Sequence, residues 1–402
     1  MKPLNLVVFG FNPWSRMWKR TQTLTSLLRG RPGLGDILFV NPSLHAMDLA
    51  RRPVLLKSSA VRESLAYAGG KRTPEGVTVY TPVVPPLAYP GKPLAGLRRR
   101  LEMGRIGPFV RDDFILYMNA LLRKDNTVFW ELFERARHRI FDWSDDFSTF
   151  AANARERRVD EEIATTFLEA SDLVVAVNES LAARARQVNP HSYCLRNATN
   201  FELMNRAESE ATPVHGGIAA LRGPVVGYMG YMNPTRIDTE LLRAVATENP
   251  DLQFVFLGPM VTDNPLGTEL PLRPNVHFFP PVPYDELPGV LKGFDVCIIP
   301  NRINEHTAGN DPIKLFDYLA CGRPIVATPT AGLEGFAEVV DLATDATEFT
   351  AALRRNLQPR AGADEARARR LQAARENSWQ ARADKLGGWL DAAILNKGAG
   401  GE

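Results

Sequence analysis

The chain has 402 residues, more than one hydrophobic core usually serves, so two domains of about 200 residues are expected. Lys and Arg number 48 against 46 Asp and Glu, and this balance argues against a dedicated nucleic-acid binder, so no nucleic-acid partner is expected. The three cysteines form no CxxC pair, and the six histidines show no metal-ligand spacing. These patterns predict neither a disulfide framework nor a metal site.

The chain contains no apolar run of the roughly 18 residues that a membrane-spanning helix needs, and its first residues lack the pattern of a signal peptide. Widely spaced cysteines also suit a reducing compartment. We therefore expect a cytoplasmic location, either free or at the inner face of a membrane.

The first half of the chain alternates short apolar runs, typical of strands covered on both faces, with helix-like stretches. Strands are predicted at 4–11, 37–42, 77–83, 138–143 and 172–178, and helices near 20–28 and 113–122. This alternation predicts a doubly wound parallel sheet.

A polar, turn-rich stretch interrupts the pattern at about 200–223, and a second series of strands and helices follows. Its strands are predicted at 224–229, 253–258, 276–279, 295–300 and 324–328, and its helices at 238–248, 284–292 and 312–321. The fold class expected is α/β, with two tandem Rossmann-like domains facing each other across a cleft. Predicted boundaries are 1–205 for the first domain, 206–223 for a linker, 224–375 for the second domain and 376–402 for a helix and tail that return to the first domain.

The segment NDPIKLFDYLACGRPIVAT, residues 310–328, carries the clearest functional signal. Asp311 is placed as an N-cap, Pro312 suits the first helical turn, and Gly322 suits the residue after the helix. Lys314 lies in the first turn and Asp317 three residues later, so a cation and a carboxylate share one face. A cation at a helix N-terminus suits a diphosphate, and the carboxylate suits ribose hydroxyls. The alternative is an ordinary capped helix with a surface ion pair.

Other strand-to-helix loops carry further candidates, because ligands of open α/β sheets gather beyond the carboxyl ends of strands. In GYMGYMNPTRID, Gly230 permits close backbone approach and Arg236 can reach a phosphate, although a tight turn with an exposed arginine explains the same letters. Asn310 lies in a polar loop before the 312–321 helix. In FDWSDDF, carboxylates follow a predicted strand and can act as a base or orient a sugar hydroxyl, although one of them can be a helix N-cap; they are Asp142, Asp145 and Asp146.

With these motifs assembled, the chain resembles the GT-B glycosyltransferases, specifically the bacterial family-four-like enzymes of polysaccharide and surface-glycan biosynthesis. The resemblance rests on VVGYMGYM, VHFFPPVPYDELPGVLKGFDVCIIP, DPIKLFDYLACGRPIVAT, ENSWQARADKL and RIFDWSDDFSTF. It implies that a nucleotide-sugar, a UDP-sugar rather than a GDP-sugar, binds the second domain as a substrate and that a glycan or lipid-linked acceptor binds the first. No cofactor and no metal are implied.

The resemblance also implies roles for individual residues. Lys314 would contact the diphosphate and Asp317 the ribose, while Gly230 and Arg236 would complete the phosphate environment. Backbone groups from Val282 to Tyr284 would hold the base, and Asn310 and Asp311 would line the same donor site.

One position departs from the family pattern. Family-four enzymes commonly carry two glutamates separated by seven residues; counting back from Asp317, which stands at the second, the first falls on Gly309. A retaining reaction is favoured, with an inverting one that uses an Asp base as the alternative. Two other functions stay open: a nucleotide-sugar 2-epimerase of the same fold, and an idle nucleotide-sugar-binding subunit. A nicotinamide dehydrogenase is disfavoured because no GxGxxG follows the first strand.

Two basic segments of the first domain are candidates for acceptor contacts. PWSRMWKRTQ places Arg16, Arg20 and Gln22 after the first strand, where they can bind an acceptor phosphate. The segment 91–105, GKPLAGLRRRLEMGR, mixes leucines with five basic residues and is a candidate for peripheral membrane contact. The alternative for 91–105 is a solvated helix whose apolar face packs on its own core.

Overall fold

The computed structural model describes residues 2–15, 18–147, 151–260, 273–304, 307, 311–359 and 361–399. The chain divides into two compact units, one formed by 1–195 with 383–402 and the other by 196–382. Each unit has its own sheet, parallel apart from one edge strand of the first unit, and its own core, so the predicted α/β class with two Rossmann-like domains is confirmed.

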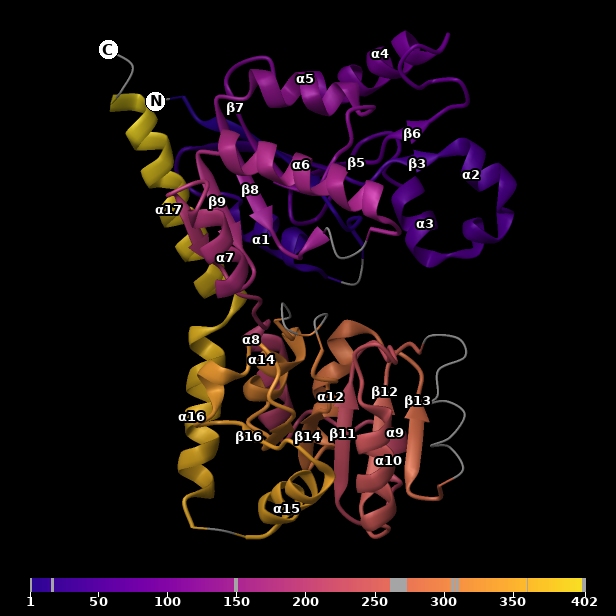
Figure 1. The fold of residues 1–402 in the computed structure, drawn as a ribbon, viewed down its shortest axis with the longest axis vertical. Helices are drawn as coiled ribbons and strands as arrows, with labels where there is room; N and C mark the ends of the chain where they lie inside the picture. Colours follow the sequence, from indigo (N-terminus) through magenta and orange to yellow (C-terminus); the bar gives the residue numbers. More distant parts are fainter. Residues whose placement is uncertain are drawn as a thin grey trace. The chain divides into compact units, whose positions relative to one another are not determined.

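The first unit is built on an eight-stranded sheet of order β10-β9-β8-β7-β1-β2-β5-β4, in which only β4 runs antiparallel to its neighbour (Figure 1). The strands are β1 (Leu4–Gly10), β2 (Leu34–Val40), β4 (Lys71–Arg72), β5 (Thr78–Tyr80), β7 (Phe114–Asn119), β8 (His138–Trp143), β9 (Leu173–Ala176) and β10 (Ser192–Cys194), with a separate pair β3 (Leu44–His45) and β6 (Val83–Val84). The helices are α1 (Arg20–Leu28), α2 (Ala46–Arg51), α3 (Ser59–Leu65), α4 (Ala95–Ile106), α5 (Thr127–Arg135), α6 (Ala154–Ala170) and α7 (Glu179–Arg186), with short 3-10 turns at Pro53–Lys57 and Gly107–Phe109. Helix α17 (Trp379–Ala399) starts in the second unit and belongs to the first unit from residue 383 onward.

The helix predicted at 113–122 is wrong, because this segment forms the central strand β7. All six residues of Phe114–Asn119 are buried, and β7 pairs with β1 on one side and β8 on the other. The periodicity of a short apolar run that is buried on both faces does not distinguish a helix from a strand.

The second unit has a six-stranded parallel sheet of order β13-β12-β11-β14-β15-β16. Its strands are β11 (Val225–Met229), β12 (Gln253–Leu257), β13 (Val276–Phe279), β14 (Val296–Ile299), β15 (Ile325–Ala327) and β16 (Asp341–Leu342). Its helices are α8 (Phe201–Met204), α9 (Gly216–Ala219), α10 (Thr239–Glu248), α12 (Leu287–Lys292), α14 (Ile313–Ala320), α15 (Ala346–Leu357) and α16 (Ala363–Glu376), with 3-10 turns at Asn205–Glu208, Tyr284–Glu286 and Glu334–Phe336.

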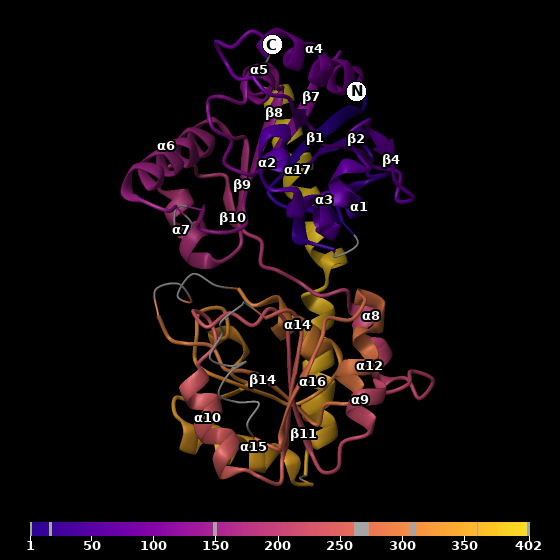
Figure 2. The same ribbon diagram turned by 90° about the vertical axis from the view of Figure 1, so that its right-hand side faces the viewer.

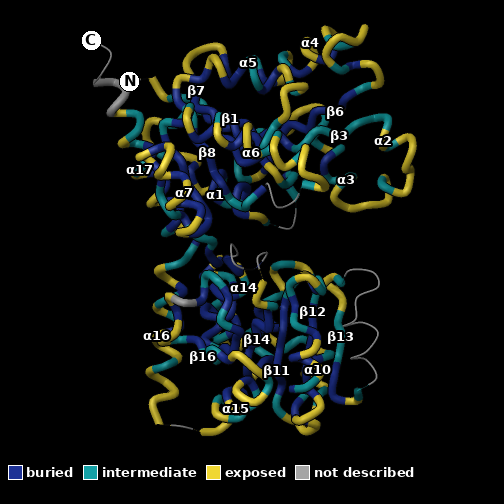
Figure 3. Tube along the Cα trace, viewed as in Figure 1, coloured by how far each residue is buried: buried dark blue, intermediate teal, exposed yellow. Residues whose placement is uncertain are grey.

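Helices cover both faces of the second sheet, as Figure 2 shows for α10 and α15 on one face and α12 and α16 on the other. Alternate residues of each strand supply the two cores, so that Val225 packs toward α12 and α14 while Val226 packs toward α10 and α15. The buried strands with exposed outer helix faces are visible in Figure 3. This doubly wound arrangement places strand-to-helix loops along one edge of the sheet.

The predicted linker 206–223 is instead part of the second unit, which begins at Arg196. Ala207 and Ile218 are buried in the second core, and burial of this kind fixes a segment to its domain. Residues 383–402 belong to the first unit, where Trp389 stacks on Tyr193 with ring centroids 4.6 Å apart and Asp391 pairs with Arg31.

Candidate functional site

Helix α14 follows the loop after β14 and brings the main candidates together. It spans Ile313–Ala320, close to the predicted 312–321, and its C′ residue Gly322 has the positive φ of +67° that glycine tolerates best. Leu315, Phe316 and Leu319 are fully buried and hold the helix against the sheet. Lys314 and Asp317 are therefore presented one turn apart by a firmly packed helix.

The Lys314 ammonium lies against the end of β11. Its Nζ donates a hydrogen bond to Tyr228 Oη at 2.5 Å and stands 3.9 Å from the centroid of the same ring. Gly230 lies next to this side chain and has a φ of +137°; a Cβ at 230 would stand 3.4 Å from Lys314 Cε, which is an ordinary contact distance. The backbone conformation therefore favours glycine at this position.

The positive charges of Lys314 and Arg236 repel each other near the end of β11. Burial, and next the charge of Arg236, lower the pKa of Lys314 to about 7. Arg236 lies in the loop after β11, where its carbonyl accepts the Arg302 amide at 2.7 Å. Positive groups held together and partly desolvated favour binding of an anion, which would relieve their repulsion.

Asp317 is 5% exposed and accepts a hydrogen bond from Thr199 Oγ1 at 2.7 Å. Burial raises its pKa to about 7, although the Thr199 hydroxyl acts in the opposite direction. Tyr284 lies near enough that burial and then the Asp317 charge raise the pKa of its phenol. The structure thus brings together Gly230, Arg236, Tyr284, Lys314 and Asp317, which we call the α14 cluster.

The sequence analysis did not identify Thr199, because the segment RNATNF around it matches no functional motif. Its side chain is fully buried and contacts Asp317, 118 positions away, only in the folded chain. Its backbone is fixed at the junction of α16 and α17, where its carbonyl accepts the Trp379 amide at 2.9 Å and its amide donates to the Asn377 carbonyl at 3.2 Å. Thr199 therefore positions the Asp317 carboxylate.

Replacing Thr199 by Val should raise the pKa of Asp317 further, because the ionised carboxylate loses its donated hydrogen bond. A bond of this type corresponds to a shift of about one unit or more. The pH below which nucleotide affinity falls should move upward accordingly, as measured by titrations across pH. Thr199→Ser keeps the hydroxyl and should retain the wild-type profile; equal profiles for all three proteins would contradict the role.

Of the predicted donor-binding residues, Asp311 is corrected and Asn310 lies outside the described residues. Asp311 does not cap α14, whose N-cap is Pro312. Its buried carboxylate instead accepts Arg196 Nε at 3.0 Å and the Asn197 amide at 2.6 Å, so it fastens the start of the second unit and is occupied within the fold. Val282, two residues before Tyr284, is partly buried against the second core.

In the first unit, Asp142 and Arg20 prove to be partners of each other. Arg20 Nη2 stands 3.0 Å from Asp142 Oδ1, and Tyr117 Oη donates to Oδ2 at 2.8 Å. Side-chain exposure is 6% for Arg20 and 0% for Asp142, so neither the predicted base nor the predicted phosphate ligand has an accessible charge. Both assignments are corrected to a structural ion pair.

The remaining candidates of the first unit differ in burial and in their hydrogen-bond or ion-pair partners. Gln22 is buried; its Nε2 donates a hydrogen bond to the Ser15 carbonyl at 3.0 Å, and its Oε1 accepts one from the Ser15 amide at 3.2 Å. Gln22 therefore holds the loop before α1, and its predicted role as an acceptor-binding residue is corrected. Arg16 lies outside the described residues. Asp145 and Asp146 are partly buried, and Asp146 pairs with Arg184 at 2.8 Å.

Asp142→Asn should destabilise the first unit by about 3–5 kcal/mol, because it leaves the Arg20 charge buried and uncompensated. Asp146→Asn is the matched control, since its partly exposed ion pair is worth about 1 kcal/mol or less. Denaturant unfolding distinguishes them, and an Asp142→Asn protein that keeps wild-type stability would restore Asp142 as a candidate base.

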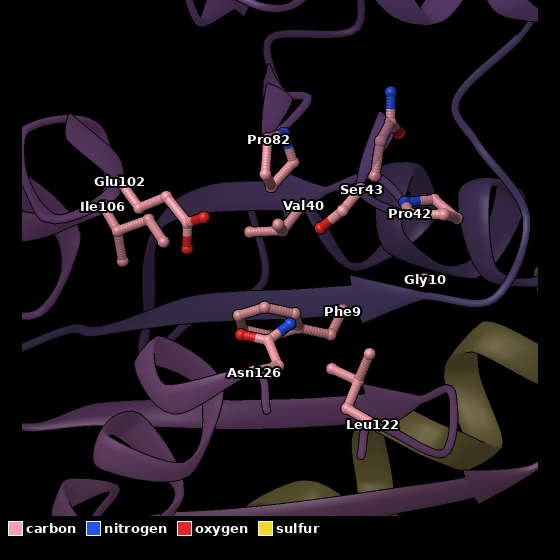
Figure 4. Close-up of a pocket in the computed structure, with 11 residues that line it drawn as sticks. Phe9, Gly10, Val40, Pro42, Ser43, Pro82, Glu102, Ile106, Leu122 and Asn126 are labelled. Atoms are coloured by element: carbon pink, nitrogen blue, oxygen red, sulfur yellow. The ribbon is translucent and has the colours of Figure 1, made fainter. Parts of the chain in front are cut away.

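A small pocket opens at the carboxyl ends of β1 and β2 (Figure 4). Its polar lining includes Glu102 and Asn126, but Glu102 accepts Arg98 Nε at 2.7 Å and Asn126 caps α5. Both side chains thus serve the fold, and the α14 cluster remains the stronger site.

The described residues contain no group of three or more His, Cys, Asp or Glu side chains placed to hold a metal ion. Within the same residues, no helix combines the length and apolar character needed to cross a membrane.

The fold and the α14 cluster define the class: two Rossmann-like units of the GT-B type, with a cation and a carboxylate at a helix start in the second. Residues 236–387, which include most of the cluster, match the family model described as "Glycosyl transferase-like". The predicted resemblance to GT-B glycosyltransferases is confirmed.

Individual relatives agree with this class. A Bacillus subtilis (strain 168) protein named "Putative teichuronic acid biosynthesis glycosyltransferase TuaH" is 28% identical over 153 residues, which are 38% of this chain and 37% of that protein. The match thus spans little more than a third of the curated relative.

Solved structures match along nearly the whole chain. Sucrose-phosphate synthase from Thermosynechococcus elongatus has a TM-score of 0.66 at 16% identity, covering 98% of this chain and 100% of that one. Anabaena Alr3699/HepE in complex with UDP-glucose has a TM-score of 0.65 at 13% identity, covering 97% and 100%. A trehalose-6-phosphate protein from E. coli bound with UDP-2-fluoro glucose has a TM-score of 0.65 at 12% identity, covering 95% and 98%. At these identities the matches establish the fold.

Proposed function

We propose that the protein is a glycosyltransferase that moves a sugar from a nucleotide diphosphate sugar, preferably a UDP-sugar, to a glycan or lipid-linked acceptor. The observation that carries the proposal is the pair Lys314 and Asp317 on α14, a partly buried cation and a buried carboxylate one turn apart. The complexes of fold relatives with UDP-glucose and UDP-2-fluoro glucose support a uracil nucleotide.

Each member of the α14 cluster has a task in this proposal. Lys314 and the first backbone N–H groups of α14 neutralise the diphosphate, and Arg236 adds a second positive charge. Asp317 accepts hydrogen bonds from the ribose hydroxyls, in the orientation that Thr199 gives it. The backbone at Val282 to Tyr284 contacts the base.

The reaction breaks the bond between the anomeric carbon and the phosphate oxygen, and UDP leaves with that electron pair. The acceptor oxygen forms the new bond to the same carbon, and its proton passes to the leaving phosphate oxygen when configuration is retained, or to a carboxylate base when it is inverted. Lys314 and the helix N-terminus stabilise the charge that develops on the leaving diphosphate, a task that a metal ion performs in other enzymes. We favour retention of configuration; for inversion, Asp145 or Asp146 would be the base, because both are partly exposed whereas Asp142 is fully buried in its ion pair.

The acceptor class rests on the relative. TuaH carries the name of a teichuronic acid biosynthesis glycosyltransferase, which supports a polysaccharide acceptor of bacterial origin. We propose that the first unit holds this acceptor.

The test is incubation of the protein with UDP-glucose and other UDP-sugars, with chelator present, with and without bacterial glycan and lipid-linked oligosaccharide acceptors. Release of UDP that depends on an acceptor, and a product extended by one sugar, would support the proposal. Conversion of the donor to its 2-epimer without acceptor would replace it by an epimerase. Tight donor binding without turnover on any acceptor would favour an idle binding subunit.

A further inference from the structure

Helix α4 of the first unit carries exposed leucines and basic residues on one side. Leu97 and Leu101, four residues apart, are 48% and 57% exposed, and Arg100 and Arg105 beside them are also exposed. The other side of the helix is anchored by Ile106, which is buried in the first core. Two large apolar side chains thus face outward from a helix that already has a packed face.

The loop before α4 extends this surface. Leu87 is 55% exposed and has a φ of +60°, a left-handed conformation that a leucine rarely adopts. Its carbonyl accepts the Leu94 amide at 3.0 Å, which ties the loop to the start of the helix, and Lys92 between them is exposed. We call Leu87, Lys92, Leu97, Arg100, Leu101 and Arg105 the α4 patch.

The charge of this surface has one sign. Within 83–106 the single acidic residue is Glu102, which is buried and paired with Arg98 at 2.7 Å. Arg99 is neutralised by Glu131 at 2.9 Å. In the described part of the chain, no ion pair engages Lys92, Arg100 or Arg105, so three exposed positive charges lie on the same helix and preceding loop as the leucines.

We propose that the α4 patch binds the surface of a bilayer that contains anionic lipid. Leucines that reach the boundary of the acyl chains, surrounded by cations at the level of acidic headgroups, are the combination that interfacial helices use. The charge decides for an anionic lipid surface, because three cations without an exposed acidic side chain within 83–106 complement acidic headgroups, whereas an apolar protein contact alone would not need a cationic rim. Of the segment 91–105 considered in the sequence, only this outer part contributes; Arg98 and Arg99 belong to the fold.

The test is flotation of the full chain with vesicles of phosphatidylcholine, with and without phosphatidylglycerol. We expect binding to the anionic vesicles only, weakened by salt. Arg100→Ser and Arg105→Ser should each weaken partitioning about fivefold, and Leu97→Ser and Leu101→Ser by a similar factor, roughly fivefold each. Arg206→Ser, which removes an exposed arginine of the second unit, is the matched control and should change partitioning less than about twofold. Unchanged melting temperatures would show that the variants fold.

Three results would overturn the proposal: no flotation with anionic vesicles, equal flotation with neutral vesicles, or equal flotation of the patch variants and the wild type. Self-association in sedimentation that Leu97→Ser abolishes, without vesicle binding, would assign the face to a protein contact instead.

Discussion

Lys314→Met should weaken UDP binding at least tenfold and raise the thermal stability of the protein. A hydrogen bond between charged groups is worth about 1.5–3 kcal/mol, which corresponds to a factor of about 10 to 150 in Kd. Stability should rise because burial lowers the pKa of Lys314 from 10.5 to about 7. The folded protein then holds that proton less tightly than the unfolded chain does, so the lysine reduces stability below about pH 10 and most strongly below pH 7.

Lys292 provides the matched control in the same unit. Its Nζ donates to the carbonyls of Ser209 at 2.7 Å and Thr212 at 2.8 Å, so it serves the fold. Lys292→Met should lower the melting temperature and leave the Kd for UDP within about twofold, whereas Lys314→Met should raise the melting temperature by about 2 °C or more. Calorimetric titration and thermal unfolding of both variants check the contrast. A loss of stability in Lys314→Met with unchanged UDP affinity would make Lys314 a structural residue.

The affinity for UDP-glucose should follow a bell-shaped pH profile with its maximum near pH 7. Burial raises the pKa of Asp317 to about 7, so at lower pH the carboxyl becomes protonated and loses part of its capacity to accept ribose hydroxyls. The pKa of Lys314 is lowered to about 7, so at higher pH the amine becomes neutral and holds the diphosphate less strongly. One proton is linked to each limb, so the slope can reach about tenfold per pH unit.

Single substitutions should remove one limb each. Asp317→Asn should flatten the acidic limb, and Lys314→Met should flatten the alkaline one. UDP-glucose is the suitable ligand, because each of its two phosphates is bound by one ester and by the shared anhydride, has no second ionisable hydroxyl and stays ionised throughout the range. Titrations between about pH 5.5 and 8.5 cover both groups. A profile without either limb, or limbs that persist in these variants, would contradict the assignment of the two residues.

The sequence was sufficient for features that depend on local spacing. Lys314 and Asp317 share a face because the helix period places residues three apart together, and the residues around 312–322 define both helix ends within one residue. The apolar runs of the strands, such as LNLVVFG and QFVFL, likewise predict a buried parallel sheet.

What the sequence could not show depends on contacts between distant residues. Arg20 and Asp142 are 122 positions apart, and their pairing converts two functional candidates into one structural ion pair. Asp311 would cap a helix by local rules, but Arg196 and Asn197, more than 110 positions away, take its oxygens. Thr199 and Tyr228 reach Asp317 and Lys314 only through the packing of the second unit. The strand β7 was misassigned because period and length do not separate a short buried strand from a helix.

The most direct test of the account is a crystal structure of the protein with UDP, grown with chelator present. We expect the diphosphate within hydrogen-bond distance of Lys314 Nζ and the first turn of α14, and the ribose hydroxyls on the Asp317 carboxylate. A nucleotide bound elsewhere in the second unit, or a saturated crystal with the α14 cluster unoccupied, would contradict the central claim that this cluster is the donor site.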